Sequence, residues 1–261
     1  EGYRVPTAPP DAPLDDVEEV SSYVAALNHG LERLRGGMPV SKRLLREIHG
    51  ILLSTGRGSD KAPGEFRRSQ NWVGGSSPSR ASHVPPPPDR VEGCMDDLER
   101  YLHSPEAKTE PLLAAAYAHV QFETIHPFLD GNGRVGRLLI ALVLTDAGLL
   151  SEPILYLSLY FKAHREEYYR LLDGVRSRAD WESWLGFFAV AARDTARQAV
   201  ETARRVALLA QADRDRLAGL GRGMPKALAV FERFRVRLVR TIAQLSGETG
   251  LAPNTVAKAV E

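Results

Sequence analysis

Residues 126–137 read HPFLDGNGRVGR, and they separate two apolar segments of the chain. The segment before them, residues 111–125, has apolar side chains at the spacing of one buried helix face. The segment after them, residues 138–144, reads LLIALVL and is apolar throughout. Both segments are therefore predicted to be core helices, and the glycine-rich run between them must form the loop that joins them.

That loop has the composition of an anion-binding site. Glycines allow backbone N–H groups to approach an anion closely, and the positive end of the following helix dipole would face that anion. The amides of Gly131 and Gly133 and the side chain of Asn132 can cradle a phosphate. Arg134 and Arg137 can make forked, charge-assisted contacts with the outer phosphates. The residues thus predict a phosphate-handling site.

Two further side chains of the loop can carry chemistry. His126 can accept a proton from an attacking hydroxyl, because an imidazole ordinarily titrates near neutral pH. Asp130 can hold a Mg²⁺ ion that neutralises phosphate charge, and it can also cap the helix that follows. Other histidines are expected at the surface or in local hydrogen bonds: His83, His103, His119 and His164.

Three other interpretations of the loop fail on context. Gly131, Gly133 and Gly136 satisfy the dinucleotide pattern GxGxxG, but that pattern needs a preceding strand, and the preceding residues here are helical. A Walker phosphate loop would need a GK[ST] ending, which is absent. A zinc site would need a second ligand near His126, which the local sequence lacks.

Most of the remaining sequence is also predicted to be helical. Asp15 or Asp16 is predicted to cap a helix that ends near Arg35, and Ser41 to cap one that ends near Leu53. Further helices are expected at about residues 90–103, 162–175 and 180–217.

Residues 54–88 are the exception, because they are rich in glycine, proline and serine. Strand-like pieces at residues 71–73 and 82–84 flank a turn from Gly74 to Arg80. This pattern predicts a β-hairpin in an otherwise helical protein, with Trp72 either anchoring the hairpin or meeting a ligand.

The composition allows one sizeable core and gives no overall charge field. The chain has 261 residues, 43% of them hydrophobic, and its 34 basic and 33 acidic residues leave a net charge of +1. Cys94 is the only cysteine, which predicts a reducing, cytoplasmic setting. No apolar run approaches the ~20 residues of a membrane span. The chain begins at Glu1 without a methionine or signal peptide, so we expect it to be trimmed there.

Glycines and a proline at residues 219–225 predict a linker before a separate C-terminal part. Residues 241–261 have the pattern of a helix-turn-helix, with the turn at residues 250–253. Its second helix is predicted to turn Val256, Ala259 and Val260 inward. Four arginines upstream form a basic patch compatible with DNA phosphates: Arg233, Arg235, Arg237 and Arg240.

The segment 126–137 resembles, position by position, the HPFx[D/E]GNGRxxR motif of Fic-domain proteins. Residues 64–75, GEFRRSQNWVGG, resemble the family's approach to the flap, a hairpin that aligns the target side chain by strand pairing. LYLS at 155–158 and EYY at 167–169 are also similar, and the resemblance covers about residues 1–215. It implies the Fic fold and transfer of AMP from ATP to a Ser, Thr or Tyr hydroxyl of a protein, or removal of that AMP.

The resemblance also implies a role for each site residue. His126 would deprotonate the target hydroxyl, and Asp130 would bind Mg²⁺. Asn132 would contact the α-phosphate, Arg134 the β-phosphate and Arg137 the γ-phosphate. The loop departs from the Doc-like variant, which carries a lysine and phosphorylates its target, so adenylylation is favoured. The full set implied to bind the nucleotide is Asn71, Trp72, Val73 and Gly74 in the flap, Gly131, Asn132, Gly133, Arg134, Gly136 and Arg137 in the loop, and Tyr168 and Tyr169 at the adenine.

Glu1 and Gly2 resemble the end of the inhibitory [S/T]xxxEG motif of Fic proteins that regulate themselves with an N-terminal helix. In that motif the glutamate pairs with the second arginine of the loop, here Arg137, and blocks productive placement of the γ-phosphate. The resemblance therefore implies that Glu1 is inhibitory. The Ser or Thr of the motif would lie upstream of Glu1, so only two positions match.

The predicted protein is mainly α-helical: a Fic fold with a β-hairpin flap, followed by a winged-helix-like helix-turn-helix segment. Its predicted parts are an N-terminal region with the inhibitory motif at 1–40, a catalytic domain at 41–217, and a linker with a partial winged helix at 218–261. The predicted activity is Mg²⁺-dependent protein adenylylation, with ATP as co-substrate and a protein hydroxyl, on this chain or another, as target. Three alternatives stay open: removal of AMP with Glu1 orienting a water, a DNA-binding regulator with a nucleotide-sensing site, and a homodimer.

Overall fold

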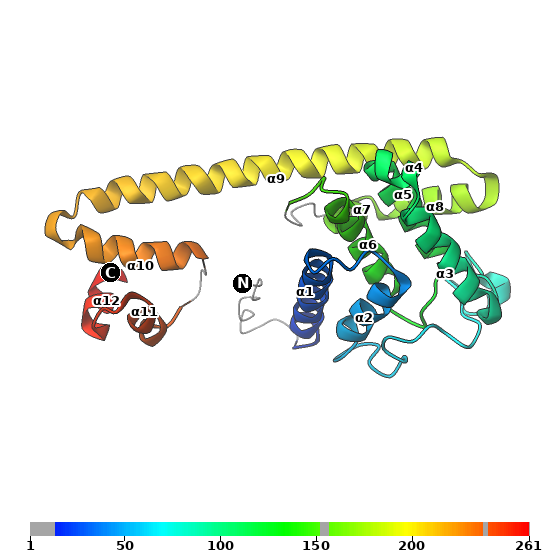
Figure 1. Cartoon of the computed structure of the whole chain (residues 1–261), viewed down its shortest axis with the longest axis horizontal. Coiled ribbons are helices and arrows are strands. Elements are labelled where there is room, and N and C mark those ends of the chain that lie inside the picture. Colours follow the sequence, from blue (N-terminus) through cyan, green and yellow to red (C-terminus); the bar gives the residue numbers. More distant parts are fainter. Residues whose placement is uncertain (1–13, 152–156, 237–239, 261) are drawn as a thin grey trace. The chain divides into compact units, whose positions relative to one another are not determined.

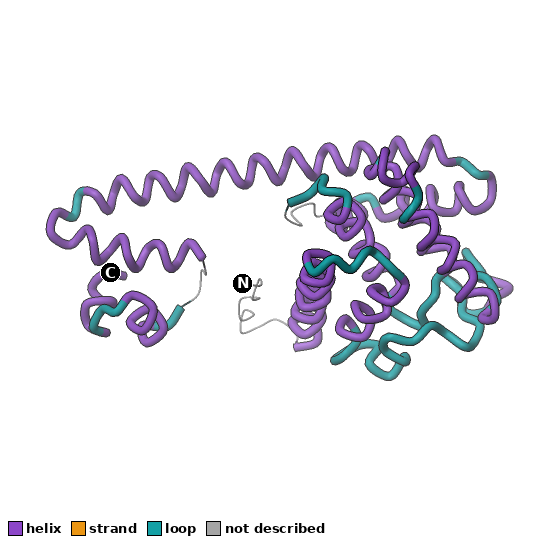
Figure 2. Tube along the Cα trace, in the orientation of Figure 1, coloured by secondary structure: helices purple, strands orange, loops and turns teal. Residues whose placement is uncertain are grey.

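Figure 1 shows the computed structural model of the chain, in which residues 14–151, 157–236 and 240–260 are described. The chain divides into two compact units, Glu1–Ala196 and Arg197–Glu261. The described residues form helices and loops, with one isolated β-bridge and no sheet (Figure 2). The mainly helical fold predicted from the sequence is thus confirmed. None of the described helices has the length and apolar character that a membrane crossing requires.

Several helices of the first unit match their predicted residues. α5 spans Pro111–Ile125 as predicted, and α6 spans Asn132–Asp146. Ser41 caps α2, because its side chain accepts a hydrogen bond from the backbone N–H of Leu44 at 3.3 Å. The remaining helices are α1 Leu14–Arg35, α2 Lys42–Leu52, α3 Pro88–Leu102, α4 Pro105–Thr109, α7 Leu157–Ala163, α8 Arg165–Arg178 and α9 Trp181–Ala218.

Other helices differ from the prediction. α1 begins at Leu14, so Asp15 and Asp16 lie inside its first turn and do not precede it. The helix predicted at 162–175 is two helices, α7 and α8, with His164 between them. α4 was not predicted, since it is a single turn that begins at a proline after the capping side chain of Ser104.

α5 and α6 pack against each other at the centre of the first unit (Figure 1). Small side chains of α5 are at most 1% exposed, which allows neighbouring helices to approach its backbone closely: Ala114, Ala115, Ala116 and Ala118. α9 contributes Trp184, which is fully buried and donates its indole N–H to the carbonyl of Ala116 at 3.1 Å. The core therefore holds both ends of the loop that joins α5 to α6.

The flap segment, residues 71–84, pairs where the hairpin was predicted but over one residue pair only. Val73 forms an antiparallel bridge with His83, and its N–H donates to the carbonyl of His83 at 2.9 Å. A 3₁₀ turn, Pro78–Arg80, lies between the paired residues. Gly75 has a φ of +67°, and a Cβ there would lie 2.3 Å from the carbonyl oxygen of Arg80. The tight turn and its prolines shorten the pairing because they leave few residues in extended conformation.

The second unit is built on a small core. Val230, Leu245 and Val256 are each at most 2% exposed and pack together. Ala259 lies partly buried against them as predicted, but Val260 is 53% exposed, so its predicted inward position is wrong. The elements are the C-terminal part of α9, a 3₁₀ turn Gly221–Gly223, α10 Met224–Val236, α11 Ile242–Thr249 and α12 Pro253–Val260. α11 and α12 form the two short helices predicted around the turn, and the winged-helix assignment stays a prediction.

Candidate active site

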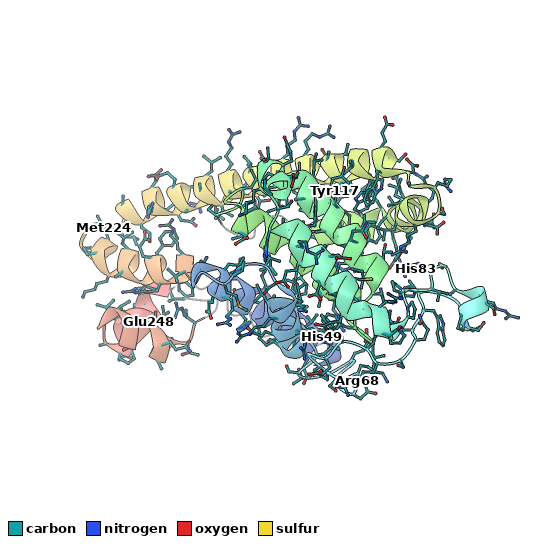
Figure 3. The ribbon with its side chains drawn as sticks, turned by 45° about the vertical axis from the view of Figure 1, so that its right-hand side comes forward. His49, Arg68, His83, Tyr117, Met224 and Glu248 are labelled. Carbon is teal, nitrogen blue, oxygen red and sulfur yellow. The ribbon has the colours of Figure 1, made fainter. Side chains whose placement is uncertain are left out.

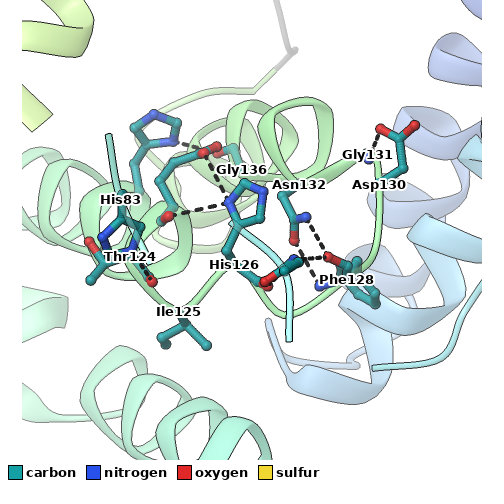
Figure 4. Close-up of polar contacts among 12 residues, drawn as sticks. His83, Thr124, Ile125, His126, Phe128, Asp130, Gly131, Asn132 and Gly136 are labelled. Atoms are coloured by element: carbon teal, nitrogen blue, oxygen red, sulfur yellow. Dashed lines mark hydrogen bonds and ion pairs between the residues drawn. The ribbon is translucent and has the colours of Figure 1, made fainter. Parts of the chain in front are cut away.

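The loop between α5 and α6 begins with a strained residue. His126 ends α5 in the left-handed conformation, with a φ of +49°, and its N–H donates to the carbonyl of Phe122 at 2.8 Å. A non-glycine residue in this conformation costs about 1–3 kcal/mol, so the surrounding structure must impose it. Gly131, with a φ of +78°, then forms the N-cap of α6. The two left-handed residues set the start and the end of the loop (Figure 4).

Asn132 closes the loop on itself. Its side-chain oxygen accepts the backbone N–H of Phe128 at 2.9 Å, and its NH₂ group donates to the carbonyl of Phe128 at 2.8 Å (Figure 4). Asn71 of the flap segment also donates to that carbonyl, at 2.9 Å. Asn132 is 2% exposed, so its amide shapes the loop. The α-phosphate contact suggested for Asn132 stays a prediction.

His49, which the sequence did not single out, fastens the loop from α2 (Figure 3). Its Nδ1 accepts the backbone N–H of Gly64 at 2.8 Å, so Nε2 carries the proton and donates to the carbonyl of Asp130 at 3.1 Å. Its ring stacks on Phe128 at 3.7 Å between centroids. Burial lowers the pKa of His49 to about 4, which keeps the ring neutral. A lone histidine in an amphipathic helix gave no signal of this role.

Two arginines that the sequence did not single out bind carbonyl groups at the C-terminus of α5: Arg67, which is buried, and Arg176, which is half-buried. Arg67 donates to the carbonyls of His126 at 3.0 Å and Pro86 at 2.5 Å. Arg176 of α8 donates to the carbonyl of Glu123 at 3.0 Å and to the hydroxyl of Thr124 at 3.2 Å. Because the last carbonyls of a helix lack partners within it, these contacts stabilise the end of α5 and the strained residue that follows.

His126 is held as a neutral base. Its side chain is 18% exposed. Burial, together with the charges of Arg176 and Arg67 and the neighbouring His83 ring, lowers its pKa to about 4. Its Nδ1 lies 3.4 Å from the carbonyl oxygen of Glu123, an acceptor that favours a proton on Nδ1. A neutral ring of this tautomer leaves Nε2 to accept a proton.

Asp130 and Arg134 lie at the edge of the loop. One carboxylate oxygen of Asp130 accepts the N–H of Gly131 at 2.6 Å, and the other lies 4.0 Å from Nε of Arg57. Arg134 lies 3.4 Å from a carboxylate oxygen of Glu19 on α1 and 3.9 Å from Asp130. Among the described residues, no three His, Cys, Asp or Glu side chains cluster as a metal site.

The loop glycines are closely packed. A Cβ at Gly131 would lie 2.7 Å from the side chain of Leu53, and one at Gly133 would lie 3.2 Å from the guanidinium of Arg137. A Cβ at Gly136 would lie 2.5 Å from a carboxyl oxygen of Glu123. Side chains larger than hydrogen would thus displace the loop or its neighbours.

The tyrosines implied at the adenine differ in exposure. Tyr168 is 5% exposed and donates its hydroxyl to Nε2 of His119 at 2.8 Å, whereas Tyr169 is 49% exposed. His119 is itself fully buried and donates from Nδ1 to the carbonyl of Gly136 at 2.9 Å, so its expected surface or local position is wrong. Trp72 is 40% exposed. Glu1 lies outside the described residues.

Comparison with known proteins identifies the domain that carries this loop. Residues 39–144 match the model of the Fic/DOC family. A protein adenylyltransferase Fic of Drosophila persimilis is 32% identical over 177 residues, which are 67% of this chain and 32% of the relative. One of Aedes aegypti is 40% identical over 127 residues, 48% of this chain and 23% of the relative. The chain thus spans a third or less of these two curated relatives.

Solved structures share the fold. A Fic family protein from Desulfovibrio desulfuricans has a TM-score of 0.57 and 30% identity, over 73% of this chain and 55% of that one. Fic-1 from C. elegans has a TM-score of 0.55 at 22% identity, over 77% and 56% of the two chains, and supports the fold alone. The chain therefore contains a Fic domain.

Proposed function

We propose that the chain is a protein adenylyltransferase, which transfers AMP from ATP to a Ser, Thr or Tyr hydroxyl of a protein. The observation that carries the proposal is His126, a neutral imidazole held in a strained conformation at the end of α5, where the glycine-rich loop that leads to the N-terminus of α6 begins. That geometry sets a proton acceptor beside an anion-binding helix end. The curated relatives named as adenylyltransferases support the same activity.

The proposed reaction needs one proton acceptor and several anion contacts. Nε2 of His126 takes the proton of the target hydroxyl, whose oxygen attacks the α-phosphorus while pyrophosphate leaves. The backbone amides at the start of α6 receive the phosphates, and Arg134 and Arg137 neutralise the outer two. Because Arg134 already faces Glu19 at 3.4 Å, the nucleotide would compete with that carboxylate.

Asp130 fits a Mg²⁺ ion shared with the nucleotide. Its side chain is 32% exposed at the mouth of the loop, and a single carboxylate completed by phosphates and water is a common protein contribution to Mg²⁺ binding. When bound, the ion would neutralise phosphate charge. Asp130 would keep it beside the arginines without a further protein ligand.

Two labelled nucleotides test the proposal. The chain is incubated with a cell extract and Mg²⁺, and with ATP labelled at the α-phosphate or, separately, at the γ-phosphate. Adenylylation predicts protein label from the α position only. Label from the γ position would instead indicate a kinase. If no protein is labelled but AMP is released from an AMP-modified protein, the reverse reaction is favoured. If neither reaction occurs, a nucleotide sensor is favoured.

We further propose that Glu1 restrains this activity by pairing with Arg137. Two observations support it: the resemblance of Glu1 and Gly2 to the inhibitory motif, and the surroundings of Arg137. Among the described residues, no carboxylate oxygen lies within 4.0 Å of that guanidinium, whereas Arg134 faces Glu19 and Asp130. Arg137 therefore has capacity for one more anionic partner, a carboxylate or a phosphate.

The substitution Glu1→Gly tests this restraint. Adenylylation should rise about tenfold while the affinity for ATP changes little, because only the productive geometry of the phosphates is restored. Glu32→Gln, which removes an exposed carboxylate of α1, serves as the control and should leave both quantities unchanged. If AMP removal is the true reaction, Glu1→Gly should abolish it. Equal rates for variant and parent in both directions would show that Glu1 has no regulatory role.

A further inference from the structure

A second acidic group lies beside the proposed base. Glu123 belongs to α5, three residues before His126, and its side chain is only 9% exposed. One carboxyl oxygen, Oε2, lies 4.0 Å from Nδ1 of His126, which is an electrostatic contact but too long for a hydrogen bond. The carbonyl oxygen of Glu123 also faces Nδ1, at 3.4 Å. Two acceptors of one residue therefore face the same ring nitrogen.

The carbonyl of Glu123 is a weak acceptor for Nδ1 of His126. Its distance of 3.4 Å from Nδ1 is long, and it already accepts a hydrogen bond from Arg176 at 3.0 Å. The carboxyl group is less occupied. Its Oε1 is buried and has no hydrogen-bond partner among the described residues. A buried acceptor without a partner is costly, so its retention beside a base needs a reason.

The packing around Glu123 is specific to the carboxyl group. Gly136 of α6 faces it, and a Cβ at that position would lie 2.5 Å from Oε1. The absence of a side chain at Gly136 therefore leaves the space that the carboxyl group of Glu123 occupies. The strained φ of +49° at His126 turns the chain at the end of α5, where the imidazole meets Glu123. The glycine of α6 and the turn at the end of α5 thus both help to place Glu123 beside His126.

Charged groups from several elements act on this pair. Burial raises the pKa of Glu123 to about 7, although Arg137 of α6 and Arg176 of α8 oppose that rise. Tyr168 of α8 also interacts electrostatically with the same carboxyl group, while its hydroxyl is hydrogen-bonded to His119. The imidazole of His126 is acted on by Arg176, and also by Arg67 and His83 from the segment before α3. Near neutral pH the carboxyl group changes its charge while the imidazole remains neutral.

We propose that Glu123 is a positioning residue for His126: its carboxylate keeps the imidazole proton on Nδ1, so that Nε2 is free to accept the proton of the target hydroxyl. This inference rests on the proposed adenylyl transfer. It assigns to Glu123 no contact with the substrate. The carboxylate acts through the ring, by reinforcing the weak carbonyl contact at Nδ1.

The protonation state of Glu123 then sets the tautomer of His126. A protonated carboxyl group presents a donor to the ring, which favours the tautomer with the proton on Nε2, and that tautomer cannot act as the base. Loss of the proton restores the acceptor at Nδ1. Because the pKa of Glu123 is raised to about 7, the active arrangement is lost below that pH and gained above it. The rate of the chemical step should therefore rise with pH through this region.

The first experiment measures single-turnover AMP transfer by the full chain between about pH 6 and pH 8, for the parent and for Glu123→Gln. The amide copies the shape of the protonated carboxyl group, so the variant should remain at the low acidic rate and lose the rise, with about a tenfold deficit at the upper pH. Glu123→Asp keeps a carboxylate and should retain the rise at a reduced rate. Glu201→Gln removes an exposed carboxylate of α9 and should match the parent.

A purely structural role for Glu123 predicts a different outcome. Glu123→Gln would then be slower by the same factor at every pH and would keep the rise. That result would overturn the inference, provided that the parent transfers AMP.

The second experiment reads the tautomer without any turnover. The full chain is labelled with ¹⁵N-histidine, and the ring signals of His126 are assigned with His126→Asn. In the parent at pH 8, Nδ1 should be protonated and Nε2 should not, and the populations should shift toward the opposite tautomer as Glu123 gains its proton. This pH series needs no variant that might misfold. A fixed tautomer across the series, or one unchanged in Glu123→Gln, would contradict the inference even if adenylyl transfer itself is not observed, so the two proposals can fail separately.

Discussion

The arginines of the two compact units have different partners. In the first unit Arg67 and Arg176 donate hydrogen bonds to backbone carbonyls at the end of α5. Arg134 and Arg137 of the same unit lie in the first two turns of α6. In the second unit Arg240 pairs with the carboxylate of Glu248. Further arginines there are also partnered: Arg214 and Arg235 with Glu232, and Arg233 with the carbonyl of Glu248. A cluster of basic residues in a sequence is therefore no measure of free positive charge.

This difference bears on the DNA-binding alternative. That hypothesis needs arginines free to contact phosphates, and the described arginines of the C-terminal basic patch are engaged by acceptors of their own unit. Arg134 also faces a carboxylate of its own unit, Glu19, at 3.4 Å. Arg137, in contrast, has no carboxylate oxygen within 4.0 Å among the described residues, and it lies near a helix N-terminus, where a cation is unfavourable unless an anion binds. The observations thus favour anion recognition in the first unit.

The two units also differ in the size of their cores. The core cluster of the first has buried side chains from α1 to α9, whereas the core cluster of the second consists of Val230, Leu245 and Val256 among the described residues. A strained residue such as His126 persists only when many contacts impose it, and the larger core supplies them. Substitutions at the loop should therefore affect chemistry strongly, and substitutions in the second unit should affect only local stability.

The largest effect is expected for His126→Ala. Loss of the general base should reduce the rate of AMP transfer by about 10²- to 10⁴-fold and leave ATP binding largely intact, because the base acts on the chemical step and not on the phosphates. Single-turnover kinetics and ATP titration measure the two quantities. His164→Ala, at an exposed histidine, is the matched control. Turnover unchanged by His126→Ala would eliminate the proposed mechanism.

A smaller effect, on stability, is expected for Gly136→Ala. The new Cβ would lie 2.5 Å from Oε1 of Glu123 and 3.3 Å from the ring of Phe122, so the free energy of unfolding should fall by about 1–3 kcal/mol. Gly93→Ala in α3 meets no atom within 4 Å and should instead gain about 0.5–1 kcal/mol through helix propensity. Denaturant unfolding of both variants measures the contrast. Equal changes in stability would mean that Gly136 is not packed against the carboxyl group of Glu123.

Sequence patterns predicted the parts of the fold that local rules determine. The apolar run of α5, the capping side chain of Ser41 and the glycine-rich loop were each found from neighbouring residues. The hairpin predicted for the flap overestimated the strand pairing, which is a single bridge. The sequence pattern locates the turn, but it does not show how many residue pairs the neighbouring prolines permit.

The partners of the loop could not be predicted in the same way. His49 and His119 contact residues 81 and 17 positions away in sequence, so no local pattern links them to the loop. Val260 was misplaced for a related reason: an apolar residue at the end of a short helix can point inward only if the core extends to it. The residues of the loop could thus be predicted from the sequence, but the distant residues that hold the loop in place could not.

The smallest effect is expected in the second unit, where Val256→Ala removes two methyl groups from a fully buried side chain. At about 0.8 kcal/mol for each buried carbon, the change should cost roughly 1–2 kcal/mol. Val260→Ala, on the same helix but 53% exposed, should change stability by less than about 0.5 kcal/mol. Hydrogen exchange resolved by residue measures both, and Val256→Ala should increase exchange in α10, α11 and α12 while exchange in α5 and α6 stays unchanged. The rate of AMP transfer should equal that of the parent. A fall in that rate would show that the core of the second unit supports the loop. The two units would then differ in the size of their cores, but the activity of the first would depend on the second.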